Sequence, residues 1–220
     1  MPTCLTTVGN SMFSADRSEL DLYLASSSPR RRALLDQIGI KFKVISDLDV
    51  DESPEEAEAP EQYVRRLARE KALAGYARVS SSIEEKTLEM PPVLGADTCI
   101  AIDGEILGKP VDRNHGIAML RRLSGRSHTV VTAICLIDSR FELQSLSQSL
   151  VTFKTLQTGE VESYWESGEP ADKAGAYAIQ GGAARFITNL QGSYTGVVGL
   201  PLYELTELLQ SRQNAEYNKF

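Results

Sequence analysis

The sequence has few of the residues that build zinc sites or disulfide frameworks. It contains three cysteines and two histidines in 220 residues. Cys4, Cys99 and Cys135 are far apart and form no CxxC or CxxH pair, so they predict neither kind of site. His115 and His128 have no ligand pattern near them. We therefore expect a reducing compartment, with Cys99 and Cys135 in the core and both histidines in structural roles.

Long apolar runs and an excess of basic residues are also absent. No window approaches the roughly 18 apolar residues of a membrane span, and the first 20 residues lack the apolar centre of a signal peptide. The formal net charge is -7, which argues against a basic surface for nucleic acids. We expect a soluble, cytoplasmic protein that binds neither a membrane nor a nucleic-acid polymer, and that meets any anionic ligand with a local positive site.

The length and the pattern of the chain favour one α/β domain. We expect a flexible tail over residues 1–20, a single domain over 21–212, a C-terminal tail over 213–220, and a surface insertion over 80–91. Helices and strands mix without strict βαβ alternation, which predicts a mixed sheet. Helical patterns cover 29–38, 61–78, 113–123, 159–167 and 200–213. Strand patterns cover 22–25, 42–50, 93–110, 128–138 and 146–155, and the strand pattern at 93–110 has a turn at 103–104. Residues 176–193 predict a hairpin that is broken by glycines.

An arginine cluster stands at the start of the first predicted helix. In SSSPRRRALL, residues 26–35, Pro29 suits the first helical turn, and Arg30, Arg31 and Arg32 follow it. Backbone N–H groups at a helix N-terminus and adjacent guanidinium groups suit phosphate oxygens. The alternative is that the arginines only solvate the first turn, although cations there oppose the helix dipole. No Walker motif is present.

Other candidate residues each have a structural alternative. Asp97 ends the apolar run VLGA, so its carboxylate suits a divalent metal or general base catalysis, or simply a turn. Lys109, beside a proline, is a phosphate ligand or a surface lysine. Gln180, beside glycines and downstream of Asp172-Lys173, offers an amide that can read a base edge, or belongs to a hairpin. The acidic run 47–61 is a solvated loop, from which Asp51 or Glu52 can reach a metal.

Six segments in order together resemble the Maf family of nucleoside triphosphate pyrophosphatases. They are LASSSPRRRALL, EQYVRRLAREKA, LGADTCIAIDGEILGKP, LRRLSGRSHTVVTA, SGEPADKAGAYAIQG and GSYTGVVGLPL, spread over about 22–209. The resemblance implies an elongated α/β fold of the Maf and ITPase type, with a mixed, bent sheet, flanking helices and a deep cleft between two lobes. It also implies a possible homodimer.

The same resemblance implies the reaction and the site. The family splits a nucleoside triphosphate into the monophosphate and pyrophosphate with a divalent cation, Mg²⁺ or Mn²⁺, and DKAGAYAIQG resembles the branch that acts on dTTP and UTP. The implied roles are general base or metal ligand for Asp97; substrate specificity for Arg30, Thr98 and Gln180; phosphate binding for Ser26, Arg31, Lys71 and Lys109; and metal binding for Glu52. The alternatives are a preference for 7-methyl-GTP or inosine triphosphate, and a nucleotide-binding regulator of cell division without catalysis.

Overall fold

The computed structural model describes residues 20–81 and 90–217, with side chains up to 214. Nearly all of the expected N-terminal tail and most of the expected insertion at 80–91 lie outside these residues. Within them, the chain forms a seven-stranded sheet in the order β2-β1-β3-β5-β6-β7, with β4 paired to β3. The β1 strand is parallel to β2 and β3, and the other pairs are antiparallel. The predicted mixed α/β sheet is confirmed.

The elements follow the sequence patterns closely where those patterns are long. The strands are β1 (Leu22–Leu24), β2 (Phe42–Val44), β3 (Val93–Ile102), β4 (Glu105–Leu107), β5 (Ser127–Ile137), β6 (Glu142–Phe153) and β7 (Ile187–Gln191). The helices are α1 (Pro29–Gln37), α2 (Pro60–Ser80), α3 (Arg113–Leu123), α4 (Thr158–Glu166), α5 (Tyr194–Val198) and α6 (Leu202–Tyr217), and three 3-10 turns are η1 (Glu169–Asp172), η2 (Ala174–Ala176) and η3 (Gly182–Phe186).

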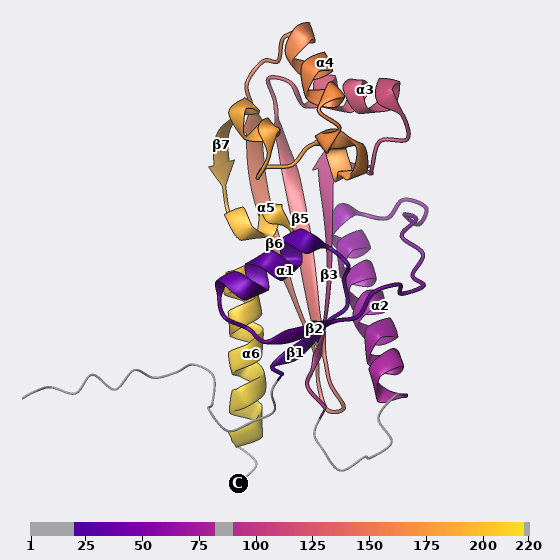
Figure 1. Cartoon of the computed structure of the whole chain (residues 1–220), viewed down its shortest axis with the longest axis vertical. Helices are drawn as coiled ribbons and strands as arrows, with labels where there is room; N and C mark the ends of the chain where they lie inside the picture. The colour runs from indigo at the N-terminus through magenta and orange to yellow at the C-terminus, as the bar shows by residue number, and fades with distance from the viewer. Residues whose placement is uncertain (1–19, 82–89, 218–220) are drawn as a thin grey trace, which may run out of the picture.

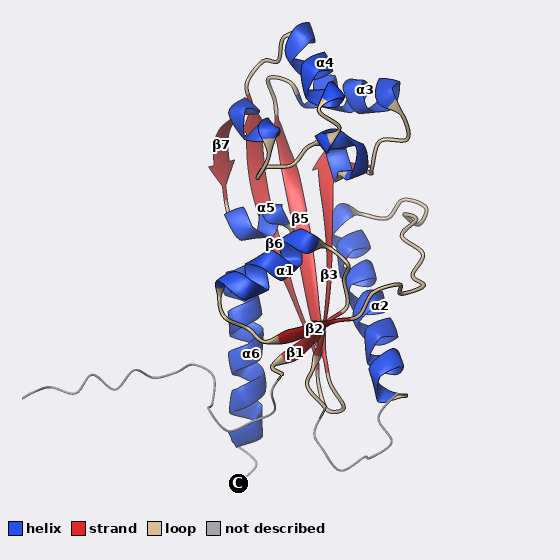
Figure 2. Ribbon diagram, in the orientation of Figure 1, coloured by secondary structure: helices blue, strands red, loops and turns tan. Residues whose placement is uncertain are grey.

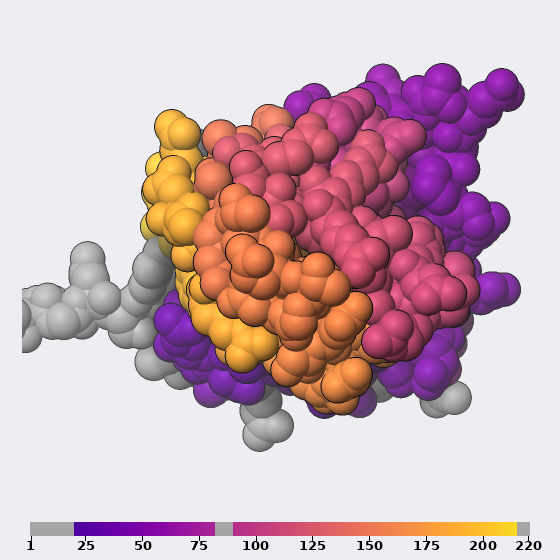
Figure 3. Space-filling model, turned by 90° about the horizontal axis from the view of Figure 1, so that it is seen from above, coloured from indigo at the N-terminus to yellow at the C-terminus, as the bar shows by residue number. Residues whose placement is uncertain are grey.

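The long strands β3, β5 and β6 run the length of an elongated molecule and join two lobes (Figure 1). In one lobe, α1, α5 and α6 pack on the sheet around Leu94, Ala96 and Ile134. In the other lobe, α3, α4 and the 3-10 turns pack around Ile100 and Val130. Figure 2 shows α3 and α4 at the upper end, α1 and α5 across the middle, and α2 and α6 along the lower half of the sheet. Seen from above, α3 and α4 cover the upper end (Figure 3).

A polar stripe separates the two cores on this face of the sheet. Side chains alternate across a strand, so Leu94, Ala96, Thr98 and Ile100 of β3 share one face. Thr98 lies between the two apolar groups and pairs in register with Thr132 of β5. On the opposite face, α2 packs against β3 and β5. The sheet therefore has two separate hydrophobic cores on one side, with polar groups at the boundary.

Four details differ from the sequence patterns or extend them. The predicted hairpin over 176–193 is wrong in its first half, where 3-10 turns stand in place of a strand and only β7 pairs with β6. The glycines and alanines there offer too few large side chains to cover a sheet face. The strand predicted at 42–50 stops at Val44, α5 was not predicted, and α6 extends to Tyr217. Within the described residues, no helix has the length and apolarity to cross a membrane.

Candidate active site

A gap in the sheet edge places Asp97 and Thr98 at the surface of a cleft. The β1 strand pairs with β3 only at Val93 and Leu94, and β4 pairs with it only from Ile100 onward. Between these positions, the described part of the chain supplies β5 on one side of β3 and no strand on the other. The backbone edge of β3 at 95–99 therefore faces an opening rather than a neighbouring strand, and Asp97 and Thr98 line it.

A cleft of about 770 Å³ opens at this gap. Its walls come from the β1–α1 turn, the loop between β2 and α2, α2 itself, β3, β4 and the turn after it, the 3-10 turns and the end of α5. Five cationic and four acidic side chains line it, in a chain whose net charge is -7. All nine residues predicted for the site lie in these walls: Ser26, Arg30, Arg31, Glu52, Lys71, Asp97, Thr98, Lys109 and Gln180.

Asp97 is held by a lysine from the helix behind the strand. Lys71 Nζ of α2 lies 2.7 Å from Asp97 Oδ1 and 2.6 Å from Glu52 Oε1, so one ammonium group joins two carboxylates. The close approach of α2 to β3 requires Gly95, because a Cβ at that position would lie 2.1 Å from the Ala68 carbonyl oxygen. A larger residue at 95 would push α2, and with it Lys71, away from Asp97.

Burial and charge act in opposite directions on these carboxylates. Burial raises the pKa of Asp97 above its ordinary value, although the charges of Lys71 and Arg31 oppose the rise. Burial also favours the protonated form of Glu52, but the hydrogen bond and charge of Lys71, with the charge of Lys109, leave its pKa lowered overall. Asp97 is therefore the more basic of the two, and an ionised Asp97 is a stronger proton acceptor than an exposed aspartate.

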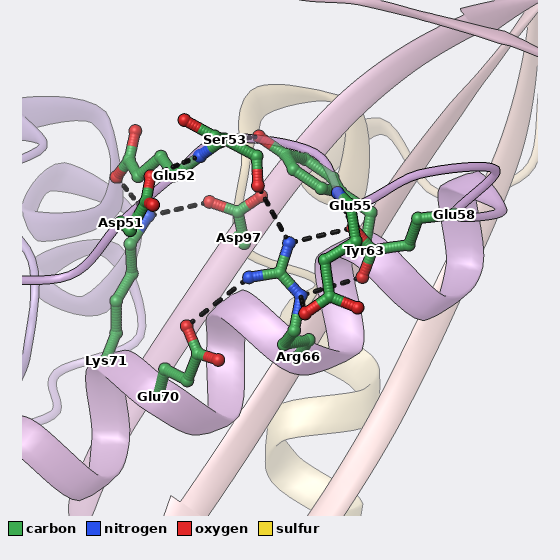
Figure 4. A network of polar contacts seen from close by, with 10 residues as sticks. All are labelled: Asp51, Glu52, Ser53, Glu55, Glu58, Tyr63, Arg66, Glu70, Lys71 and Asp97. Carbon is green, nitrogen blue, oxygen red and sulfur yellow. Dashed lines mark hydrogen bonds and ion pairs between the residues drawn. The ribbon is translucent and has the colours of Figure 1, made fainter.

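Glu52 belongs to an acidic loop, residues 45–59, that is tied to α2 (Figure 4). The Tyr63 hydroxyl donates to the Glu52 carbonyl oxygen at 2.9 Å, and Arg66 Nη2 donates to the Ser53 carbonyl oxygen at 3.0 Å. Arg66 also makes two bonds of 2.8 Å to the Glu58 carboxylate. Its ion-pair partners are Glu55, Glu58 and Glu70. These contacts fix the backbone at Glu52 and at the residue after it.

Arg31 spans the polar stripe between the lobes. It lies in the first turn of α1, after the N-cap Ser28 and Pro29. Its Nε donates to the Gly199 carbonyl oxygen at 2.8 Å, and its terminal nitrogens donate to Ser26 Oγ at 3.1 Å and Thr98 Oγ1 at 3.4 Å. Burial lowers the pKa of Arg31, and the Asp97 carboxylate opposes this effect. A guanidinium is charged at neutral pH in any such setting, so Arg31 brings a fixed positive charge to the cleft.

Thr98 is oriented by a chain of hydroxyl groups. Thr132 Oγ1 lies 2.7 Å from the Gly196 carbonyl oxygen and 2.9 Å from Thr98 Oγ1. A carbonyl oxygen can only accept, so Thr132 gives its one proton to Gly196, and Thr98 donates to Thr132. Thr98 Oγ1 in turn accepts from Arg31. The polar stripe of the sheet is thus fully connected, which holds Arg31 and Thr98 in one arrangement.

The wall opposite the acidic loop carries Gln180. We call it the 169–182 segment, and it consists of 3-10 turns and short connections. Gln180 is exposed in the cleft wall. Asp172 and Lys173 form an ion pair there, and their hydrogen bond lowers the pKa of Asp172, as does the charge of Arg30. Tyr177 lines the same wall, and its hydroxyl lies 2.8 Å from His128 Nε2 in the core.

Comparison with known proteins identifies the family. Residues 21–212 match the family described as Maf-like protein. This chain belongs to the Maf family. It is 53% identical over 188 residues to a dTTP/UTP pyrophosphatase of Alkalilimnicola ehrlichii (strain ATCC BAA-1101 / DSM 17681 / MLHE-1), covering 86% of this chain and 91% of that protein. It is 48% identical over 191 residues to a protein of the same name from Escherichia coli O157:H7, covering 86% and 92%.

A further relative and a solved structure complete the comparison. A dTTP/UTP pyrophosphatase of Aromatoleum aromaticum (strain DSM 19018 / LMG 30748 / EbN1) is 48% identical over 198 residues, which cover 86% of this chain and 94% of that protein. The Staphylococcus aureus Ham1 protein superposes with a TM-score of 0.44 at 14% identity, covering 87% of this Maf chain and 98% of that structure.

The Maf chain also has cleft residues that the sequence patterns did not single out. Tyr63 and Tyr177 line the cleft, although Tyr63 reads as part of the apolar face of α2 and Tyr177 as part of a hairpin. Thr132 orients Thr98 through a hydrogen bond. It lies in a largely apolar strand, and its polar side chain is the one sequence signal for this role. Arg32 is exposed and stands outside the cleft walls, unlike its two neighbours. His128, Cys99 and Cys135 are buried, as expected.

Proposed function

We propose that this protein hydrolyses dTTP and UTP to the nucleoside monophosphate and pyrophosphate. The observation that carries the proposal is the chain of charges Glu52, Lys71 and Asp97 at the sheet gap, with Gln180 on the opposite wall of one cleft. The names of relatives about 50% identical to this chain support the substrate class. The cleft supplies cations for a triphosphate on one side and an amide for a base on the other.

In the proposed reaction, water attacks the α-phosphorus of the triphosphate. Asp97 takes a proton from this water, a phosphorus–oxygen bond forms, and the bond from the α-phosphorus to the bridging oxygen breaks. Pyrophosphate leaves with that electron pair. The close ammonium of Lys71 orients Asp97 and favours its ionised form, in opposition to the effect of burial, which raises its pKa. Arg31 and Lys109 lie in the same cleft and balance the charge of the phosphates.

A divalent cation fits this site when it arrives with the substrate. The described residues contain no group of three His, Cys, Asp or Glu side chains that could hold a metal alone. Mg²⁺ commonly uses one or two carboxylates together with substrate phosphate oxygens. Asp97 and Glu52, which share the Lys71 ammonium, offer that donor set. A bound Mg²⁺ or Mn²⁺ would neutralise phosphate charge, and these two residues would hold it.

Specificity in this proposal lies on the 169–182 segment and in the first turn of α1. The Gln180 amide can donate to a uracil or thymine carbonyl and accept from the ring N–H. Thr98 and Arg30 stand at the same cleft and complete the proposed base and sugar contacts. Cytosine presents a donor where uracil presents an acceptor, so a fixed amide distinguishes UTP from CTP. The homodimer and the cytoplasmic location stay predictions.

A panel of triphosphates with Mg²⁺ or Mn²⁺ tests the proposal. We expect dTTP and UTP to give the monophosphate and pyrophosphate, measured by anion-exchange chromatography, with slower turnover of CTP and the purine nucleotides. Release of orthophosphate alone would contradict the reaction. A preference for 7-methyl-GTP or inosine triphosphate would retain the reaction and change the substrate. Calorimetric binding without any turnover would indicate a nucleotide-binding regulator.

A further inference from the structure

The segment that carries Gln180 is held by two side chains at the upper end of the molecule. Tyr164 of α4 is 1% exposed, and its hydroxyl lies 2.5 Å from Glu169 Oε1. The same hydroxyl accepts a hydrogen bond of 3.1 Å from the Ala178 backbone N–H. Glu169 Oε2 accepts one of 2.9 Å from the Gly182 backbone N–H. The two contacts lie two residues before Gln180 and two residues after it.

The chemistry of this pair fixes the direction of every bond. Burial raises the pKa of Tyr164, and so does its hydrogen bond to Glu169, so the phenol keeps its proton at neutral pH. Tyr164 therefore donates to Glu169 and accepts from Ala178. Each carboxylate oxygen of Glu169 then has one donor, Tyr164 or Gly182. Neither side chain lines the cleft itself, so the pair acts on the cleft through the backbone that it contacts.

The packing around Gly181 shows that the backbone is seated against the carboxylate. A Cβ at 181 would lie 2.2 Å from Glu169 Oε2 and 2.3 Å from Glu169 Cδ. Only a residue without a side chain can occupy this position while Glu169 stays in place. A Cβ at Gly182 would meet the Tyr164 ring at 3.4 Å. Gln180 is thus followed directly by backbone in van der Waals contact with the pair.

We propose that Tyr164 and Glu169 are positioning residues for substrate specificity, because they hold Ala178 to Gly182 so that the Gln180 amide faces the base end of the cleft. This inference rests on the proposed role of Gln180 in base recognition. An exposed glutamine has three rotatable bonds, so reading a base edge depends on a fixed backbone beneath it. Loss of the pair would leave Arg31 and Lys71 in place, since they come from α1 and α2.

Binding measurements separate the base end of the cleft from the phosphate end. The variants are Tyr164→Phe, which removes the hydroxyl, and Glu169→Gln, which leaves a single acceptor oxygen where two are used. The ligands are the hydrolysis-resistant α,β-methylene analogues of UTP and CTP, and pyrophosphate alone. We expect each variant to reduce the ratio of UTP-analogue to CTP-analogue affinity by about tenfold, equivalent to about one hydrogen bond. Affinity for pyrophosphate should stay within about twofold of the wild type.

Matched controls make the same chemical change away from the segment. Tyr203→Phe removes a hydroxyl from a tyrosine that is 72% exposed on α6. Glu166→Gln neutralises an exposed glutamate three residues before Glu169. The ion-pair partner of Glu166 is Arg113, at 3.9 Å. Both controls should retain the affinity ratio. Circular dichroism reports whether each variant is folded. If Tyr164→Phe does not fold, Glu169→Gln tests the inference.

Three results would overturn the inference. One is an unchanged affinity ratio in a folded variant, and another is an equal loss of affinity for pyrophosphate and both nucleotides. The third is a wild-type protein that binds the two analogues equally well. None of these requires turnover. A protein that distinguishes the analogues but does not hydrolyse UTP would instead contradict the proposed function and leave the positioning role intact.

Discussion

The two walls of the cleft are held in place by different interactions. The acidic loop is tied to α2 largely by charged groups, with Arg66 between Glu55, Glu58 and Glu70. The 169–182 segment is held by hydrogen bonds that the Ala178 and Gly182 N–H groups donate to Tyr164 and Glu169, and by the His128–Tyr177 pair. Ion pairs that remain partly open to solvent respond to salt, whereas hydrogen bonds to a buried hydroxyl such as that of Tyr164 respond much less. In the proposed function, the first wall binds the phosphates and the second supports recognition of the base.

The largest expected effect comes from neutralising Asp97, which is joined to Glu52 of the acidic loop through Lys71. Asp97→Asn should reduce kcat by about 10²- to 10⁴-fold, the usual contribution of a general base. The same change should stabilise the fold, because the raised pKa shows that the ionised carboxylate is disfavoured there. The free energy of unfolding of the variant, relative to the wild type, should increase as pH rises from the ordinary pKa of aspartate to the raised one. Above the raised pKa the difference should stay constant. Urea unfolding near pH 4 and pH 7 measures it.

An exposed carboxylate serves as the control for Asp97. Asp103 occupies a turn with a φ of 56°, a conformation that asparagine also adopts, and it lies outside the cleft walls. Asp103→Asn should keep full turnover. If Asp97→Asn kept full turnover, Asp97 would not be the general base, and Glu52 would be the next candidate.

The second wall rests on the buried pair His128 and Tyr177, and His128 should make the stability of the fold depend on pH. Burial lowers the pKa of His128 from 6.5 to about 4, so the folded protein keeps this ring neutral while the unfolded chain takes up a proton. Stability from this group is present above pH 6.5 and is lost as pH falls toward 4. The loss is roughly 3 kcal/mol over that range. His128→Asn should flatten this part of the profile in urea unfolding, whereas the exposed His115→Asn should follow the wild type.

A crossed experiment tests whether the walls act on different steps. Gln180→Ala should lower the UTP to CTP ratio of kcat/KM by about tenfold, because one polar contact to the base is lost. Glu52→Gln should lower turnover of both nucleotides by the same factor, of about tenfold, and retain the ratio, because Glu52 adjoins Lys71 and Asp97 and not the base. Effects of Glu52→Gln on the ratio would show that the walls are not independent.

The sequence predicted much of the fold because its main patterns are local. Pro29 at the first turn of α1, the apolar stripe of α2 and the β-branched runs of β5 each determine their own structure. The second half of the 169–182 segment was predicted as part of the hairpin over 176–193, because its glycines suggest tight turns. Its real conformation depends on Tyr164 and Glu169, whose contacts with it join positions up to 14 residues apart. No local pattern shows such contacts.

The site was predicted as a set of residues rather than as an arrangement. The resemblance to the Maf family named nine residues, and all of them line one cleft. Lys71 reaches Asp97 because Gly95 allows α2 to approach β3, and because the described residues place no strand beside 95–99 on that edge of β3. Thr132 and Arg66 act through other residues. Residues of this kind have no signature in the sequence, because their importance comes from their neighbours in space.

The smallest expected effect distinguishes the two walls by their response to salt. Arg66→Gln should lower kcat/KM for UTP by about threefold at low ionic strength, since Ser53 and Glu58 lose a charged partner and Glu52 is held less firmly. Added salt weakens the same ion pairs in the wild type, because the screening length falls from about 10 Å at 0.1 M to about 3 Å at 1 M. The gap between wild type and variant should therefore narrow as salt rises.

Two comparisons assign that salt effect to the acidic loop. Arg69→Gln removes a charge from the same helix, but its partner Glu142 lies on β6 outside the cleft walls, so its kcat/KM should match the wild type at every ionic strength. Tyr164→Phe should differ from the wild type by a factor that salt does not change, because it removes buried hydrogen bonds. If the gap for Arg66→Gln were equally insensitive to salt, the acidic loop would be held by the geometry of its hydrogen bonds, and the two walls would be alike.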